Sequence, residues 1–109
     1  MKNSEPVVSA TVSKDTSITN GCCLRGYVST TYDALVNILG EPITGHCGDG
    51  KVNCEWILKF DCGSIATIYD WKMTNTPMEE YRWHIGGTGI DVVRKVGDFL
   101  NMPVERFSF

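Results

Sequence analysis

The chain has 109 residues, of which 42% are hydrophobic, and its formal net charge at neutral pH is −3. This length corresponds to one domain, and the negative charge argues against a protein that tracks a nucleic-acid backbone, which would show a basic excess. A small anion held by a local cluster of cations remains compatible with the composition. Apolar runs fall short of the roughly 20 residues that cross a bilayer, and residues 1–6 lack a signal-peptide core, so we expect a soluble intracellular protein.

The first third of the chain predicts one strand and one helix. Residues 1–20 are rich in Ser, Thr, Val and Asn and are expected to form either a flexible tail or an edge strand around residues 7–12. Residues 24–29 are typical of a short strand. Apolar side chains then recur at helical spacing over residues 32–39, with Thr30 or Thr31 as N-cap and Gly40 as the stop.

The middle of the chain predicts a β-hairpin. Apolar and polar residues alternate over residues 52–60, which is the pattern of a half-buried strand. Residues 61–64 then form a turn, and the β-branched and aromatic residues 65–71 return as the second strand.

A further strand and a helix are expected after Pro77. Tyr81, Trp83 and Ile85 alternate as in a strand, although one helical turn is the alternative. Thr88 is predicted to cap a helix over residues 88–101, with Asp91 reaching back as a capping box. Residues 21–109 are therefore expected to form a single α+β ligand-binding domain, with a small antiparallel sheet and two helices packed on one face.

The five cysteines fit no disulfide framework, because their number is odd. His46, Cys47, Cys54 and Cys62 could in principle surround a zinc ion, but their spacing matches no paired C-x-x-C knuckle. Buried or free thiols are the favoured interpretation, and we expect no metal and no cofactor.

Rings, cations and glycines are concentrated between residues 69 and 94. Trp71 and Trp83 could stack on a purine; core packing is the alternative, and we expect only one of the two to reach a ligand. The backbone amides of Gly86 and Gly87, just before a helix, could meet a phosphate, although a structural turn is equally compatible. The candidate ligand-binding residues are Arg25, Tyr27, Tyr69, Trp71, Lys72, Arg82, Trp83, His84, Gly86, Gly87 and Arg94.

The histidines and carboxylates do not indicate catalysis. His84 is not part of a recognisable Ser-His-Asp order or of a pair of catalytic acids, so a hydrogen-bonding or core role is favoured for it. Arg94 lies off the apolar stripe of the last predicted helix and is free to reach a ligand, although most charged side chains are simply solvated. We therefore expect a binding protein and not an enzyme.

Several segments resemble the first class of Thoeris anti-defence proteins, a family of small phage-encoded sponges. The most specific are residues 66–72 (ATIYDWK) and 83–87 (WHIGG), and the resemblance extends over about residues 24–100. It implies a non-enzymatic protein in the cytoplasm of an infected bacterium. Such a protein sequesters glycocyclic ADP-ribose immune signals without cleaving them, with cyclic trinucleotides as a further ligand class.

The resemblance also implies a homo-oligomer with ligand pockets between subunits. The apolar stripe of the last predicted helix continues into Met102, Val104, Phe107 and Phe109, which supplies surface for such an interface. Two alternatives to a sponge remain open at this point. One is a small enzyme that degrades a cyclic nucleotide signal, and the other is an inhibitor that binds a host protein.

Overall fold

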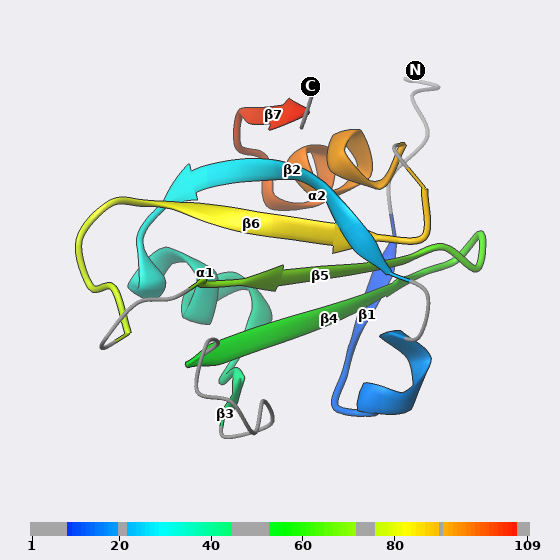
Figure 1. Ribbon diagram of the computed structural model, residues 1–109, viewed down its shortest axis with the longest axis horizontal. Helices are drawn as coiled ribbons and strands as arrows, with labels where there is room; N and C mark the ends of the chain where they lie inside the picture. Colours follow the sequence, from blue (N-terminus) through cyan, green and yellow to red (C-terminus); the bar gives the residue numbers. More distant parts are fainter. Residues whose placement is uncertain (1–8, 20–21, 45–52, 72–75, 90, 107–109) are drawn as a thin grey trace, which may run out of the picture.

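The computed structural model describes residues 9–19, 22–44, 53–71, 76–89 and 91–106. These residues form an α+β fold built on one seven-stranded antiparallel sheet, which confirms the predicted fold class. The order across the sheet is β1 (Ala10–Ser13), β4 (Cys54–Phe60), β5 (Ile65–Tyr69), β6 (Tyr81–Gly87), β2 (Cys23–Thr30) and β7 (Val104–Arg106), and β3 (Ile43–Thr44) pairs with one end of β4 (Figure 1).

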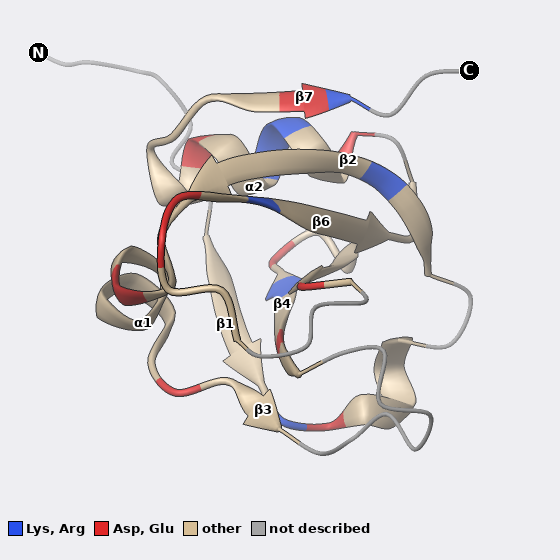
Figure 2. Ribbon diagram, turned by 60° about the vertical axis from the view of Figure 1, so that its left-hand side comes forward, with Lys and Arg blue, Asp and Glu red and all other residues tan. Residues whose placement is uncertain are grey.

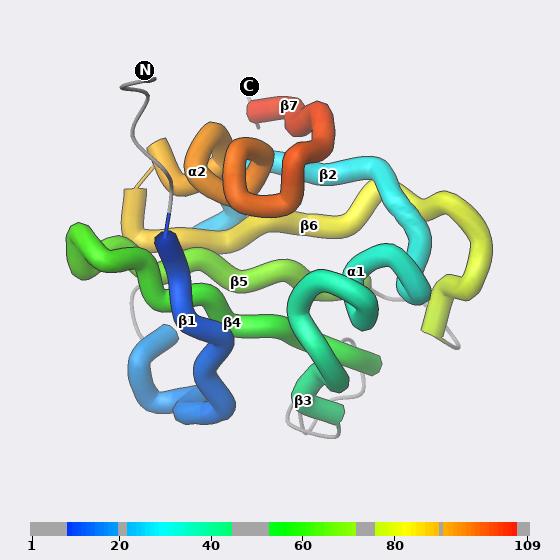
Figure 3. Tube along the Cα trace, turned by 180° about the vertical axis from the view of Figure 1, so that it is seen from behind, coloured from blue at the N-terminus to red at the C-terminus, as the bar shows by residue number. Residues whose placement is uncertain are grey.

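Both helices, α1 (Tyr32–Leu39) and α2 (Val92–Leu100), lie against the same face of the sheet (Figure 3). They bury apolar side chains in one core with the inward residues of β4, β5 and β6. At its centre the rings of Trp56 and Trp83, both at most 1% exposed, meet edge to face with 5.5 Å between centroids. Such pairs contribute about 0.5–1.5 kcal/mol to stability beyond the contribution from burying the two rings.

The termini of α1 follow from local sequence signals. The Thr31 hydroxyl accepts a hydrogen bond from the Ala34 N–H at 3.2 Å, which satisfies one free donor of the first turn. Gly40 ends the helix with φ +86°, a conformation that favours glycine, and its N–H donates to the Val36 carbonyl. Leu35 and Leu39 face the core, while Ile38 is 42% exposed.

The predicted hairpin is also confirmed, with Trp56 opposite Ile68 in register. Its second strand ends at Tyr69, so Trp71 lies beyond it. At the outer side of β4, Ala10 pairs with Phe60, which settles residues 10–13 as an edge strand. The glycine-rich stretch at 45–50 lies outside the described residues.

The predicted start of the last helix was wrong. The helix begins at Val92 with Asp91 as N-cap, and the Asp91 side chain makes no capping bond. Thr88 is held by the sheet instead, because its N–H donates to the Ile65 carbonyl and its hydroxyl accepts from the Ile65 N–H. Thr88 therefore closes the ladder between β5 and β6 and is not available as a cap.

The short strands β3 and β7 were not predicted from the sequence. Val104 of β7 lies opposite Val28 and packs on α2, so part of the apolar surface expected at an interface is used within the chain. A Cβ on Gly97 would lie 2.9 Å from a Val104 methyl carbon, and the glycine therefore allows β7 to approach the helix. Among the described residues, the helices are too short and insufficiently apolar to span a membrane.

Candidate functional site

Alternation along β6 sends neighbouring aromatic residues to opposite faces of the sheet. Trp83 and Ile85 are fully buried under the helices, whereas His84 points to the other face. Across three adjacent strands His84 lies directly opposite both Tyr69 of β5 and Tyr27 of β2. These three residues therefore form one row on the face of the sheet opposite α1 and α2.

We call Tyr69, His84, Tyr27 and the adjoining Trp71 the aromatic row. Tyr69 and His84 are stacked, with 5.4 Å between centroids and an interplanar angle of 28°. Tyr27 meets His84 edge to face at 5.2 Å, and Trp71 meets Tyr69 edge to face at 6.4 Å. The first three rings are half-buried and Trp71 is 40% exposed, so the row presents a partly accessible π surface.

Arg82 adds a cation at one end of the row. Its guanidinium carbon lies 3.8 Å from the centre of the Tyr27 ring, within the range of a cation–π contact. Its Nε also lies 3.0 Å from the Glu105 Oε1, but both side chains are more than half exposed. Because an exposed ion pair contributes about 0–1 kcal/mol, a bound anion could replace Glu105 at little cost.

Tyr69 and His84 carry no charge at neutral pH. Burial raises the pKa of Tyr69 to about 12, with nearby Glu55 adding to the effect, so its hydroxyl remains a hydrogen-bond donor. Burial lowers the pKa of His84, and the adjacent Arg82 lowers it further, so the imidazole is neutral. Its Nδ1 is buried and has no hydrogen-bond partner among the described residues. A ring surface with Arg82 at one end and Glu55 opposite Tyr69 at the other suits a flat heterocycle whose anionic group lies at the arginine end.

Five of the predicted ligand-binding residues are thus brought together: Tyr27, Tyr69, Trp71, Arg82 and His84. Gly86 lies on the same face, where a Cβ would be 2.7 Å from the Thr67 hydroxyl and 3.4 Å from the Tyr69 ring. Its lack of a side chain therefore keeps the neighbouring part of this face open. Lys72 lies outside the described residues.

Three other residues predicted to bind ligand hold the fold together instead. Trp83 lies in the core and donates its Nε1–H to the Thr30 carbonyl at 3.1 Å, so of the two tryptophans only Trp71 is accessible. Gly87 lies under α2, and any Cβ there would collide with a Val92 methyl group. Arg25, at a register shift in β2, donates from Nε to the Gly87 carbonyl at 3.0 Å and thereby ties the two strands together.

Gly86 and Gly87 do not form the turn before a helix that the sequence predicted, whether as a structural turn or as a phosphate contact. Both glycines lie inside β6 and pair in register with β2 and β5. Their backbone groups belong to the sheet ladder and do not form a loop of open amides. Arg94 lies in α2, on the opposite side of the sheet from the aromatic row, and the two cannot contact one ligand within one chain.

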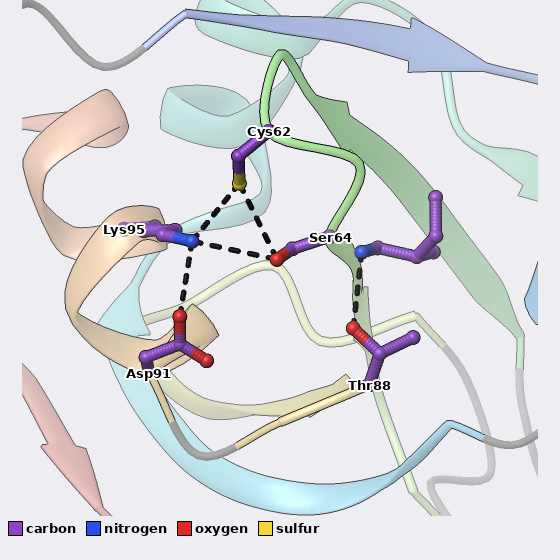
Figure 4. Close-up of polar contacts among 6 residues, drawn as sticks. Cys62, Ser64, Thr88, Asp91 and Lys95 are labelled. Carbon is purple, nitrogen blue, oxygen red and sulfur yellow. Dashed lines mark hydrogen bonds and ion pairs between the residues drawn. The ribbon is translucent and has the colours of Figure 1, made fainter.

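A second polar cluster, which sequence reasoning missed, joins the β4–β5 turn to α2 (Figure 4). The Lys95 Nζ lies 3.0 Å from the Cys62 Sγ and 3.0 Å from an Asp91 carboxylate oxygen. Hydrogen bonds from Ser64 and Lys95 lower the pKa of the Cys62 thiol to about 7. Cys62 therefore carries a substantial thiolate fraction at neutral pH. No local sequence pattern predicts the contact between Cys62 and Lys95, because the two residues are 33 positions apart.

The zinc alternative does not fit the geometry. Cys54 begins β4 and Cys62 follows its other end, which separates them by roughly 20 Å along the strand. Burial and the nearby Asp70 raise the pKa of Cys54 to about 12, so it stays a thiol. His46 and Cys47 lie outside the described residues.

Comparisons of the chain with models of protein families, with curated proteins and with solved structures find no match.

Proposed function

We propose that the protein binds a small adenine-containing cyclic nucleotide on the aromatic row and sequesters it intact. Glycocyclic ADP-ribose is the proposed ligand, and cyclic trinucleotides are a further candidate class. The observation that carries this proposal is the alignment of Tyr69, His84 and Tyr27 across three strands with the Arg82 guanidinium at the end of the row.

The dimensions and chemistry of the row are compatible with such a ligand. Neighbouring strands are about 4.8 Å apart, so a row over three strands extends for about 10 Å, enough for a purine and its sugar. Stacking of a base on an aromatic side chain is worth about 1–3 kcal/mol. Arg82 would then exchange its exposed contact with Glu105 for a charge-assisted bond to a phosphate.

Binding without cleavage is proposed because the imidazole of the row is poorly placed for general-base catalysis. In a Ser-His-Asp arrangement a carboxylate holds one imidazole nitrogen while the other takes the proton. The His84 Nδ1 has no such partner among the described residues. The same proposal locates the protein in the cytoplasm of an infected bacterium, as a homo-oligomer.

The test is a depletion experiment. The purified protein is incubated with glycocyclic ADP-ribose isomers and cyclic oligonucleotides, and the free concentration of each is measured after filtration. We expect one class to be depleted and then recovered with unchanged mass when the protein is denatured by heat. Tyr69→Ala should abolish most of the depletion, whereas Asn37→Ala, an exposed change on α1, should not affect it.

Two results would favour the alternatives. Recovery of a hydrolysed product at more than one turnover per chain would indicate an enzyme. Absence of any depletion, together with specific co-purification of one host protein, would indicate a protein-binding inhibitor.

A further inference from the structure

A groove of about 550 Å³ lies between α2 and β7, a volume within the range of small-molecule sites. Apolar side chains line much of it: Val93, Met102, Pro103 and Val104. Its charged residues are Arg94, Arg106, Asp91 and Asp98. Figure 2 shows basic segments on both α2 and β7, and these two elements are in contact with each other.

The chain reversal between the two elements builds the floor of the groove. After α2 the chain turns at Asn101, which adopts a left-handed conformation with φ 58°, and the Met102 N–H donates to the Gly97 carbonyl. β7 then runs back along β2 with Val104 packed on Gly97. The groove is thus formed by packed elements and not by a loose end of the chain.

Sheet register places the two arginines at the same end of this groove. Arg106 lies opposite Gly26, and a Cβ on Gly26 would lie 2.8 Å from a Val93 methyl carbon, so Val93 packs on this glycine. Val93 and Arg94 belong to the first turn of α2. Arg94 and Arg106 are therefore at the level of the first turn, while Val104 is one helical turn further on, beside Gly97.

The two arginines of the groove are not paired with its carboxylates in the described part of the chain. Asp91 forms an ion pair with Lys95 at 3.0 Å and not with either arginine. Arg94 and Arg106 are both exposed, and neither has an ion pair or hydrogen bond with the described part of the chain. Asp98 lies one turn along α2 from Arg94, at a spacing that allows contact, but the two side chains form no ion pair in the described part of the chain.

We propose that this groove is a second ligand site, which binds an amphipathic anion. Arg94 and Arg106 would bind its carboxylate or phosphate group, since guanidinium groups match such anions in geometry and charge. Its apolar body would cover Met102, Pro103 and Val104. The site is independent of the aromatic row, because α2 lies on the opposite face of the sheet.

The test uses 8-anilinonaphthalene-1-sulfonate, a fluorescent aromatic anion, with the full-length chain. We expect saturable binding of one probe per chain, and binding at least tenfold weaker for N-phenyl-1-naphthylamine, which has the same rings without the sulfonate. The double variant Arg94→Gln, Arg106→Gln should lose at least tenfold in affinity for the anion. The double variant Lys14→Gln, Lys59→Gln is the matched control, since it removes two positive charges from exposed side chains that line neither site, and it should stay within twofold of the wild type.

A variant with the opposite expected effect and a structural measurement distinguish loss of binding from loss of folding. Asp98→Asn removes the carboxylate one turn along α2 from Arg94 and should tighten binding two- to threefold. In amide chemical-shift mapping, the probe should shift Val93, Gly97 and Val104 more than Tyr69 and His84. The proposal is overturned if the folded double variant binds the anion as the wild type does, if the neutral analogue binds equally well, or if the shifts map to the aromatic row.

Discussion

The aromatic row and the groove between α2 and β7 lie on opposite faces of one sheet and are built in different ways. Strand register alone assembles the row, because Tyr69, His84 and Tyr27 face one another across three strands. The groove needs a helix and a chain reversal to bring Arg94 near Arg106.

The two regions also differ in how they carry charge. The aromatic row has one cation beside it, Arg82, whose guanidinium contacts the Tyr27 ring and the Glu105 carboxylate. The arginines of the groove have no partner in the described chain. A row of this kind favours a flat ring, and a groove of this kind favours an anionic head group on an apolar body.

The largest effect should come from β6, which separates the row from the core. Trp83→Ala should lower the free energy of unfolding by about 3–5 kcal/mol, because it removes a fully buried ring that packs on Trp56. Urea denaturation followed by circular dichroism measures it. Trp71→Ala, on an exposed ring, should lower stability by less than about 1 kcal/mol. Equal losses in the two variants would contradict the assignment of Trp83 to the core.

Tyr69→Ala should weaken ligand binding by about 1–3 kcal/mol, the amount associated with one stacked base. Calorimetry with the ligand that the depletion experiment identifies measures this loss. Arg94→Gln, on the other side of the sheet, should leave the same affinity unchanged within the monomer. If Arg94→Gln instead weakens it as strongly as Tyr69→Ala, the ligand reaches α2, as it would when two subunits share one pocket.

The Cys62–Lys95 contact beside α2 predicts a pH dependence of thiol reactivity. With a thiol pKa of about 7, the iodoacetamide reaction of Cys62 should reach half its maximal rate near pH 7. Lys95→Met removes the ammonium at 3.0 Å and should move that midpoint toward the ordinary cysteine value of about 8.5. Peptide mass spectrometry separates Cys62 from Cys23, which is also exposed. An unchanged midpoint in Lys95→Met would show that the lysine does not hold the thiolate.

The smallest effect should be a pH-dependent loss of stability caused by His84. Its pKa in the folded chain lies below the value of about 6.5 expected when unfolded, because burial and Arg82 disfavour the imidazolium. The unfolded chain therefore takes up this proton first, and stability should fall as the pH drops below about 6.5. Urea midpoints at pH 7.5 and 5.5 should differ more in the wild type than in His84→Gln. A larger pH difference in the variant would reverse the inferred direction of the shift.

Local patterns predicted most of the elements correctly. Thr31 and Gly40 defined α1, and alternation defined β4 and the hairpin it forms with β5, because capping and side-chain period depend on residues close in the sequence. Those patterns were sufficient for the fold class. They failed at Thr88, which forms hydrogen bonds with Ile65, a residue distant in the sequence. They also failed for β7, a short strand that depends on β2 for its hydrogen bonds.

The sequence by itself determined the fold class and showed that aromatic, cationic and glycine residues are concentrated in and around β6. Tertiary structure decided how they are used. Register turned His84 toward Tyr69 and Tyr27, and the same alternation turned Trp83 into the core, because neighbouring residues of a strand face opposite sides. Packing of α2 on the sheet carried Arg94 away from the row and brought Lys95 to Cys62. Contacts between segments tens of residues apart depend on how the elements pack, so they cannot be predicted from the spacing of residues in the sequence.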